Sequence, residues 1–253
     1  MTERWVDFTN LSLPDQIRAR VTKTLSEGIQ LNMSTEESIK FLRRYLNNRI
    51  NLVTMFVDMS NSTVMSLSLP DNKFALLVQC YAQEVSIAVL GYGGYVFKYE
   101  GDAVIVLFPA EYDETKACEN ALMCSRAIIE IMEEVINPLF KDHELPEISI
   151  RIGLSYGQAL VVLYGSDSEK AHIDIIGSGI SLASKIVSIS NPNQILVGEY
   201  VYNILRSSGS MNSSILTEIS LDPTKWKYLS HFDPQSMYRV YECTKISSSS
   251  SNL

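Results

Sequence analysis

The chain has 253 residues, of which 46% are hydrophobic and 20% charged, and its formal net charge is −8. This length and composition suit one domain with a substantial core, or one domain with a short appendage. The acidic balance, without a basic stripe, argues against nucleic acid as the main partner. Because no signal peptide and no run of about 18 apolar residues occur, we expect a cytoplasmic protein without a membrane span.

The first fifty residues predict two short helices. One begins after Leu13-Pro14-Asp15 and repeats apolar residues at helical spacing. The other follows Ser34-Thr35-Glu36-Glu37, which resembles a capping box. Residues 1–50 are too few to form much core alone. We therefore expect them to pack on the domain that follows, on a second copy of the chain, or on a regulatory partner.

From Asn51 onward the apolar pattern alternates between strand and helix. Asn51–Val57 predicts a strand, and a helix begins at Asp71 and closes at the glycines of Gly91–Gly94. A hairpin follows, with Glu100-Gly101 as its two-residue turn and Ala103–Phe108 as the returning strand.

The rest of the chain continues this alternation. In order, it predicts a long helix from Asp113 to a stop at Asn137-Pro138, two strand-like runs within Glu147–Val162, a helix over Gly177–Ile189, and short strands at Gln194–Val197 and Tyr238–Cys243. The βαββαβ order predicts a ferredoxin-like α/β sandwich of the α+β type with a mainly antiparallel sheet. We assign it to residues 51–245 and expect residues 246–253 to be a disordered tail.

The cysteines and histidines give little support for a metal or disulfide framework. Cys80, Cys118 and Cys124 fall in apolar helical patterns, and the four cysteines show no C-x-x-C spacing. We expect reduced thiols in the core. The three histidines are far apart in sequence, so a zinc site or a Ser-His-Asp triad has no local support.

Two aspartates stand at predicted strand ends. Asp58 follows Asn51–Val57, and Asp102 lies at the predicted hairpin. Two carboxylates displayed at strand ends suit hard divalent cations, which prefer oxygen ligands. Such a pair can hold two metal ions around a transferring phosphoryl group. The alternative for each aspartate alone is an ordinary turn residue.

Four motifs in this order resemble the class III nucleotidyl cyclase catalytic domain, the adenylyl and guanylyl cyclases. They are Phe56–Thr63, Phe97–Asp102, the strand Arg151-Ile-Gly-Leu-Ser-Tyr-Gly157, similar to "RIGI-x-x-G", and His172–Lys185, similar to "YD-x-x-G-x-x-x-N-x-A-x-R". The resemblance covers about three-quarters of the chain, and the family's fold is the ferredoxin-like sandwich predicted above.

The resemblance implies the metal and phosphate ligands. Asp58 and Asp102 would hold two divalent ions, Mg²⁺ or Mn²⁺, with the main-chain carbonyl of Met59 as an extra ligand. The amides of Asn61, Ser62 and Thr63, at the start of a helix, would cradle phosphate oxygens.

Lys98 and Asp174 match the positions at which the family reads the purine. An ammonium group donates hydrogen bonds and a carboxylate accepts them, so this pair complements the ring N1 and the N6 amine of adenine. Guanine presents the opposite pattern, so the pair favours ATP over GTP. The alternatives are a solvated strand-end charge for Lys98 and a turn residue for Asp174.

Ser181 and Lys185 depart from the family pattern. Most active relatives have asparagine, which orients the ribose, and arginine, which holds the α-phosphate in the transition state. The spacing keeps both residues on one helix face, but serine is shorter and lysine lacks the planar fork of arginine. Lys225 and Lys227 lie near the usual position of a triphosphate-binding lysine, although the local match is poor.

The resemblance therefore implies an adenylyl cyclase that converts ATP to 3′,5′-cyclic AMP and pyrophosphate by two-metal catalysis at a dimer interface. A homodimer would take the metal aspartates from one protomer and the purine-reading pair from the other. One alternative is a degenerate domain that binds nucleotide as a regulatory module or as half of a heterodimer with another cyclase domain. Another is a pure dimerisation module. Such a module would not need the four charged residues Asp58, Asp102, Lys98 and Asp174, which argues against it.

Overall fold

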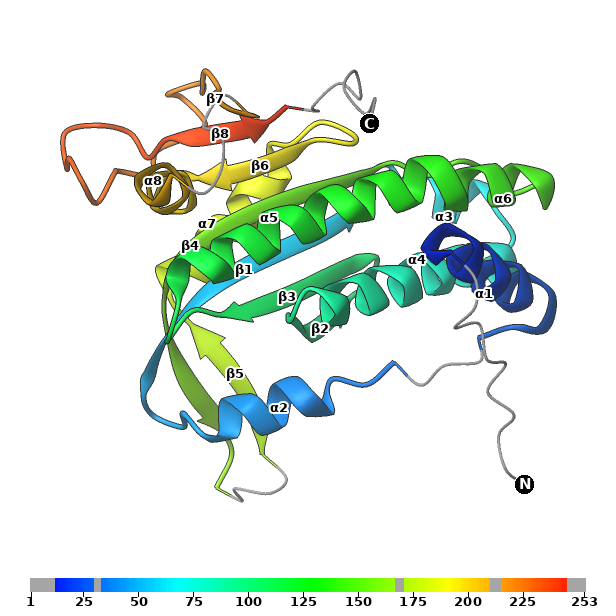
Figure 1. Ribbon diagram of the computed structural model, residues 1–253, viewed down its shortest axis with the longest axis horizontal. Coiled ribbons are helices and arrows are strands. Elements are labelled where there is room, and N and C mark those ends of the chain that lie inside the picture. Colours follow the sequence, from blue (N-terminus) through cyan, green and yellow to red (C-terminus); the bar gives the residue numbers. More distant parts are fainter. Residues whose placement is uncertain (1–11, 30–32, 167–170, 210–214, 245–253) are drawn as a thin grey trace.

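The computed structural model describes residues 12–29, 33–166, 171–209 and 215–244, and its centre is an eight-stranded sheet (Figure 1). The strands are β1 (Arg49–Met59), β2 (Tyr95–Glu100), β3 (Ala103–Pro109), β4 (Ile150–Tyr164), β5 (His172–Ile176), β6 (Ile195–Gly198), β7 (Leu216–Glu218) and β8 (Val240–Cys243). Their order is β2-β3-β1-β4-β6-β8-β7, and β5 pairs with the far end of β4. The β4–β6 pair is parallel and the other pairs are antiparallel, which confirms the predicted fold class.

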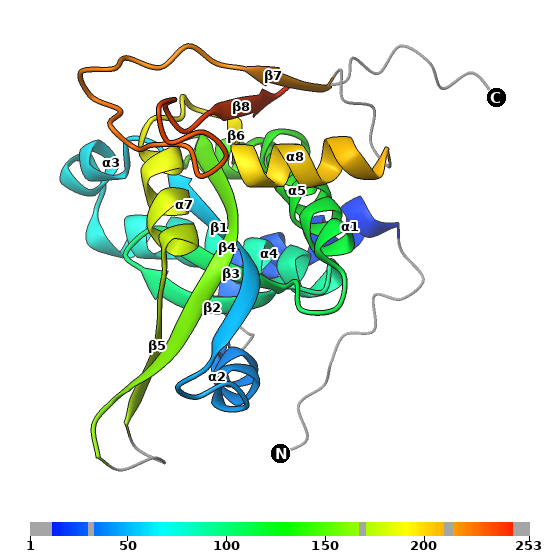
Figure 2. The same cartoon turned by 90° about the vertical axis from the view of Figure 1, so that its left-hand side faces the viewer.

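Helices cover both faces of this sheet (Figures 1 and 2). They are α1 (Leu13–Glu27), α2 (Glu36–Arg43), α3 (Ser62–Ser68), α4 (Asp71–Gly91), α5 (Glu114–Ile131), the π-helix η1 (Met132–Ile136), α6 (Asn137–Asp142), α7 (Ser178–Ser188) and α8 (Glu199–Ser208). On one face α4 and α5 lie side by side, with α1 outside α4, while α7 covers β1 and β4 on the other.

Strand β1 is central because both of its faces are apolar. Val53, Met55 and Val57 belong to the cluster under α4 and α5. Leu52 and Phe56 point the other way, into the cluster shared with α2 and α7. Successive side chains of a strand point to opposite faces, so a nearly continuous apolar run produces a strand buried on both sides. Its polar end is therefore held in a rigid position.

The N-terminal helices pack on the same domain, one of the three outcomes that the sequence left open. Ile17 and Val21 of α1 enter the core under α4, and Arg20 pairs with the buried Glu84 of α4 at 2.7 Å. From α2, Phe41 stacks on Tyr95 with ring centroids 5.0 Å apart. Strand β1 begins at Arg49, two residues before the predicted start of the catalytic domain. The division into residues 1–50 and 51–245 stays a prediction. The predicted tail, residues 246–253, lies outside the described residues.

The hairpin turn differs by one residue from the prediction. Strand β2 continues through Glu100 and β3 starts at Ala103, so the turn is Gly101-Asp102 and not Glu100-Gly101. Gly101 has φ +64°, a conformation that glycine adopts without steric cost. Asp102 therefore lies in the turn itself rather than at the start of the returning strand.

The predicted helix stop at Asn137-Pro138 is wrong. The helix passes through the π-turn η1 and continues as α6, which ends at Asp142. Pro138 occupies the first turn of α6, where a missing N–H costs little. The two runs predicted within Glu147–Val162 form the single strand β4, and the pattern did not reveal β5, β7 or α8 as separate elements.

In the described ranges, α4 is long and apolar enough to cross a membrane by length and composition, but 56% of its apolar window is buried inside the protein. Its burial against the sheet accounts for its apolar sequence equally well. The four cysteines are free and buried, as predicted. Burial raises the pKa of Cys80 and Cys124 to about 12, so these thiols remain protonated in the core.

Candidate functional site

The structure brings Asp58 and Asp102 together at one end of the sheet. Asp58 lies near the end of β1, which runs between β3 and β4. The β1–β3 pairing ends at Val57 and Val104, immediately before the turn that carries Asp102. The register therefore places Asp58 beside this turn, and the negative charge of Asp102 contributes to the raised pKa of Asp58. The roles of these residues as metal ligands stay predictions.

Arg151 also belongs to this end of the sheet. It lies directly opposite Asp58 in the β4 register, and its guanidinium forms an ion pair with the Asp58 carboxylate. Burial raises the pKa of Asp58, Arg151 opposes this rise, and Asp102 adds to it; the net direction is upward. One guanidinium therefore does not compensate fully for the burial of two neighbouring carboxylates.

Two buried polar atoms around Asp58 have no partner among the described residues. One is Oδ2 of Asp102, an acceptor, and the other is Nε of Arg151, a donor. Buried polar groups are normally hydrogen-bonded, so an unpaired acceptor and an unpaired donor at one site need an explanation. A cation would satisfy the carboxylate, and an anion would satisfy the guanidinium.

This donor set fits a metal that is bound partly through its substrate. Among the described residues, no three histidine, cysteine, aspartate or glutamate side chains lie together so that they could hold a metal ion by themselves. Mg²⁺ is usually held by one or two carboxylates together with waters and substrate phosphates, so two aspartates suffice. Met59 as a whole is 1% exposed, and the role of its main-chain carbonyl as a further ligand stays a prediction.

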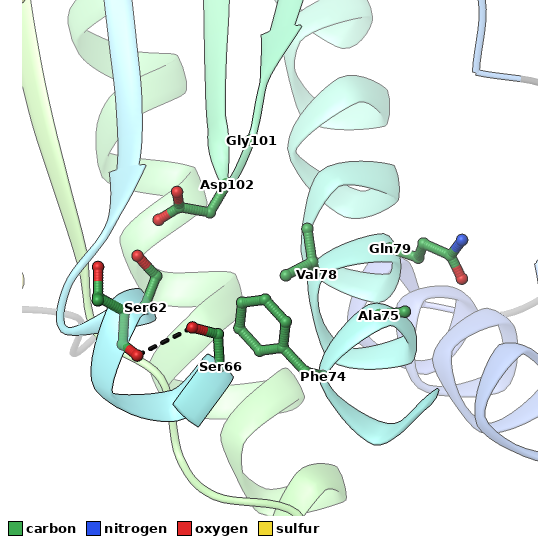
Figure 3. A pocket seen from close by; sticks show the side chains of 9 residues that line it. Ser62, Ser66, Phe74, Ala75, Val78, Gln79, Gly101 and Asp102 are labelled. Atoms are coloured by element: carbon green, nitrogen blue, oxygen red, sulfur yellow. Dashed lines mark hydrogen bonds between the residues drawn. The ribbon is translucent and has the colours of Figure 1, made fainter. Parts of the chain in front are cut away.

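A cavity of about 500 Å³ opens beside Asp102 (Figure 3). Ser62, Thr63 and Ser66 line one side, Phe74 and Val78 of α4 line another, and the carboxylate of Asp102 faces the space between them. Asn61 precedes α3 in a left-handed conformation, with φ 59°. The structure thus brings three predicted residues, Asp102, Ser62 and Thr63, into one cavity. Asp58 does not line it.

Lys98 and Asp174 form a second polar pair. The Lys98 Nζ is 2.6 Å from Asp174 Oδ2, and the Asp174 Oδ1 accepts a hydrogen bond from the Ile175 amide at 2.8 Å. Both side chains are partly buried, with exposures of 31% and 24%. A register shift between Val96 and Lys98 interrupts the β2–β3 pairing, and such a bulge can redirect a strand side chain. The predicted pairing of these two residues therefore fits the geometry.

Ser181 and Lys185 lie on the exposed side of α7. The Ser181 hydroxyl donates to the carbonyl of Gly177 at 3.1 Å, and no described side chain pairs with the Lys185 ammonium group. Lys225 and Lys227 are exposed in a loop outside any strand, around the buried Trp226. Nothing in the described contacts connects these two lysines to Asp58 or Asp102.

The glycines of the Arg151–Gly157 motif explain how α7 reaches its place. A Cβ on Gly153 would lie 2.5 Å from the amide nitrogen of Val187, so only glycine permits this approach of β4 to α7. Gly157 meets Gly179 in the same way, at 3.1 Å. The motif therefore has a packing reason that is independent of any chemistry.

Arg151 is the site residue that sequence reasoning missed. In the sequence it is only the first residue of a strand motif. Its contact with Asp58 depends on the register between β1 and β4. That register pairs Asp58 with Arg151 over a sequence separation of 93 residues. No local pattern contains this information.

The comparisons identify the class of this α+β domain. The family model of the adenylate and guanylate cyclase catalytic domain matches residues 45–232. The chain belongs to this family and is a class III nucleotidyl cyclase domain.

Three curated relatives are named cytidylate cyclase. One from Escherichia coli is 26% identical over 211 residues, 79% of this chain and 45% of that protein. The one from Staphylococcus aureus is 26% identical over 157 residues, 61% of this chain and 37% of that protein. The chain thus spans less than half the length of these curated relatives.

Solved cyclases share the fold. The adenylyl cyclase CyaB from P. aeruginosa superposes with a TM-score of 0.65 at 23% identity, covering 79% of this chain and 96% of that one. The guanylate cyclase domain of RhGC from Catenaria anguillulae, solved with GTP, gives a TM-score of 0.63 at 21% identity, covering 78% and 98%. One of these neighbours is named an adenylyl cyclase and the other a guanylate cyclase domain, so the fold alone does not select the base.

Proposed function

We propose that this domain converts ATP to 3′,5′-cyclic AMP and pyrophosphate. The observation that carries the proposal is the contact of Lys98 with Asp174 at 2.6 Å. Together the two side chains offer a donor and an acceptor side by side. Adenine presents the complementary acceptor and donor along one edge, whereas guanine presents them in the opposite order. A mismatch would leave buried polar groups unpaired, which discriminates strongly.

Class III cyclases generally use divalent metals, and the residues present fit such ions. Asp58 and Asp102 would hold Mg²⁺ or Mn²⁺, with the Met59 carbonyl, and the unpartnered Oδ2 of Asp102 is the acceptor such an ion needs. When bound, divalent ions activate the ribose 3′-oxygen and neutralise charge on the phosphates. In the absence of an ion, the Asp58 carboxylate forms its ion pair with the Arg151 guanidinium.

The chain's own side chains then position the nucleotide. The amides of Asn61, Ser62 and Thr63 would contact phosphate oxygens beside the cavity that Ser62 and Thr63 line. Ser181 and Lys185 would act on the ribose and the α-phosphate. Because serine is short and lysine makes no bidentate contact, we expect a low turnover that Mn²⁺ favours.

We further propose that two copies of the chain form a homodimer with two composite sites. Each site would combine Asp58 and Asp102 of one protomer with Lys98 and Asp174 of its partner. Mixing an Asp58→Ala chain with a Lys98→Ala chain should then rebuild one intact site per heterodimer. Recovery of up to about half the activity supports shared sites, whereas no recovery in a demonstrated heterodimer contradicts them.

CTP is a second candidate substrate, for two reasons. Cytosine also places an amine donor next to a ring-nitrogen acceptor, so Lys98 and Asp174 complement it as they complement adenine. In addition, three relatives are named cytidylate cyclase. Uracil and guanine present the reverse arrangement and fit the pair poorly.

The test is direct. Purified protein is incubated with ATP and Mn²⁺, or with ATP and Mg²⁺, and cyclic AMP is quantified by mass spectrometry. CTP is assayed in parallel, and the Asp102→Ala variant serves as the control for contaminating cyclases. Cyclic AMP from the wild type alone supports the proposal. Nucleotide binding without any cyclic product would favour the degenerate regulatory domain instead.

A further inference from the structure

Tyr81 of α4 makes an unusual contact with the strand that carries Asp58. The residue is fully buried, and its hydroxyl donates a hydrogen bond to the main-chain carbonyl of Val57 at 2.9 Å. Val57 directly precedes Asp58 in β1. A side chain from the helix layer therefore holds the backbone next to a predicted metal ligand.

This contact lies where the sheet begins to lose its own support. Val57 and Val104 are the last pair in the β1–β3 register. Strand β3 starts one residue before Val104, at Ala103, directly after the Gly101-Asp102 turn. Val57 still pairs with Val104 of β3, and a carbonyl oxygen has two lone pairs, so the phenol is an additional donor from the helix layer. It ties α4 to the strand at the residue that precedes Asp58.

Helix α4 is also tied to α1. Glu84, three residues after Tyr81, is buried and pairs with Arg20 of α1 at 2.7 Å. Gln83 donates to the hydroxyl of Thr24 at 3.3 Å. These contacts restrict rotation of the helix, so Tyr81 reaches Val57 from a rigid base.

The charges at the site favour the same role. Burial, followed by the negative charges of Asp58 and Asp102, raises the pKa of the Tyr81 phenol well above its usual value. The phenol therefore remains protonated and remains a donor.

We propose that Tyr81 is a positioning residue that fixes the end of β1 and so sets the Asp58 carboxylate relative to Asp102 for binding of a divalent ion. The inference rests on the proposed metal site. Tyr81 does not have to touch nucleotide or metal, and it acts through the Val57 main chain.

The test compares two buried tyrosines. Tyr81→Phe removes the hydroxyl at the site, and Tyr238→Phe removes the hydroxyl of a fully buried tyrosine in a different core cluster, 3.5 Å from Ser155. Mn²⁺ alone is titrated into each full-length variant without nucleotide, by calorimetry and by electron paramagnetic resonance. Thermal melting without metal measures the structural cost of each change.

We expect Tyr81→Phe to bind Mn²⁺ about tenfold more weakly, the scale typical of residues that orient metal ligands. Tyr238→Phe should keep the wild-type Mn²⁺ affinity even if both variants melt at lower temperature. Unchanged Mn²⁺ affinity in folded Tyr81→Phe, or an equal loss in both variants, would overturn the positioning role. The Asp58→Ala variant separates the hypotheses, because wild-type Mn²⁺ binding there contradicts the metal site itself.

Discussion

The two polar clusters of this domain differ in how completely they satisfy themselves. The base end, Lys98 and Asp174, is closed: Lys98 and the Ile175 amide between them contact both oxygens of Asp174. The metal end, Asp58, Asp102 and Arg151, is open, because one carboxylate oxygen and one guanidinium nitrogen are buried without partners. Without a ligand, the base end loses little stability because its polar groups are already paired. The metal end keeps unpaired buried groups until a ligand binds.

This difference predicts unequal energetics. A partly exposed ion pair such as Lys98–Asp174 contributes about 0–1 kcal/mol, so a nucleobase can open it easily. Each unsatisfied buried group at the metal end costs roughly 1–3 kcal/mol until a ligand satisfies it. Metal and phosphate should therefore supply most of the binding energy, and the base end should supply selectivity.

The largest effect is expected at the metal end. Asp58→Ala or Asp102→Ala should lower cyclase activity by roughly 10³-fold or more, because the ions that activate and neutralise the reacting oxygens lose their ligand. Calorimetry should show loss of Mn²⁺-dependent ATP binding. If the double variant binds Mn²⁺-ATP as the wild type does, Asp58 and Asp102 are not the metal ligands.

A smaller but selective effect is expected at the base end. Lys98→Glu combined with Asp174→Cys should reduce the preference for ATP over GTP by roughly 10²-fold, since the recognised hydrogen-bond pattern is removed. The ratio kcat/KM for ATP and GTP measures the change. Lys116→Gln, an exposed change on α5, alters the net charge by the same amount and is the matched control. Equal kcat/KM values for ATP and GTP in the wild type would contradict base recognition by this pair.

Restoring the family residues on α7 should raise the rate. Ser181→Asn with Lys185→Arg adds a ribose contact and a bidentate phosphate donor, each acting mainly in the transition state. We expect kcat to rise by about 10- to 100-fold, more than KM falls. Steady-state kinetics with Mn²⁺-ATP measure both constants. A flat or lower kcat would mean that this site uses another set of residues.

The smallest expected effect is a gain in stability. Asp102 contributes to the raised pKa of Asp58, so the two charges cost stability in the metal-free protein. Asp102→Asn should raise the free energy of unfolding without metal by about 1 kcal/mol near pH 7. Thermal melts with a chelator measure the gain.

The pH dependence of this gain has a definite sign. A carboxyl whose pKa is raised by folding destabilises the folded state when ionised, and this cost disappears as the pH falls through that raised pKa. The advantage of Asp102→Asn should therefore shrink as the pH falls through the raised pKa of Asp58. Added Mn²⁺ should reverse the order, because it stabilises only the chain that binds it. An advantage that grows on acidification would contradict the assigned repulsion.

The sequence was sufficient for features carried by local pattern. The apolar run before Asp58, the hairpin before Asp102 and the order of four motifs predicted the sheet, its family and the adjacency of the two aspartates. Glycines in the Arg151–Gly157 motif mark the close approach of β4 to α7, which the structure explains by steric contact.

Features that depend on register or on tertiary packing could not be predicted. The ion pair of Arg151 with Asp58 needs the β1–β4 register, and the bulge before Lys98 leaves no local signal. The helix stop predicted at Pro138 is wrong because a proline that ends one helix and a proline in the first turn of the next look alike in the sequence. Tyr81 appeared to be one more apolar residue of an amphipathic helix, although its hydroxyl supports the site.

The most direct test of base selection by Lys98 and Asp174 is a competition among four nucleotides. Equal concentrations of ATP, CTP, GTP and UTP are incubated with the protein and Mn²⁺, and the cyclic products are separated and quantified by mass spectrometry. We predict cyclic AMP as the main product, with cyclic CMP as the only substantial second product. Cyclic CMP as the main product would make CTP the substrate within the same recognition pattern. Predominant cyclic GMP or cyclic UMP would contradict recognition of the base by this pair.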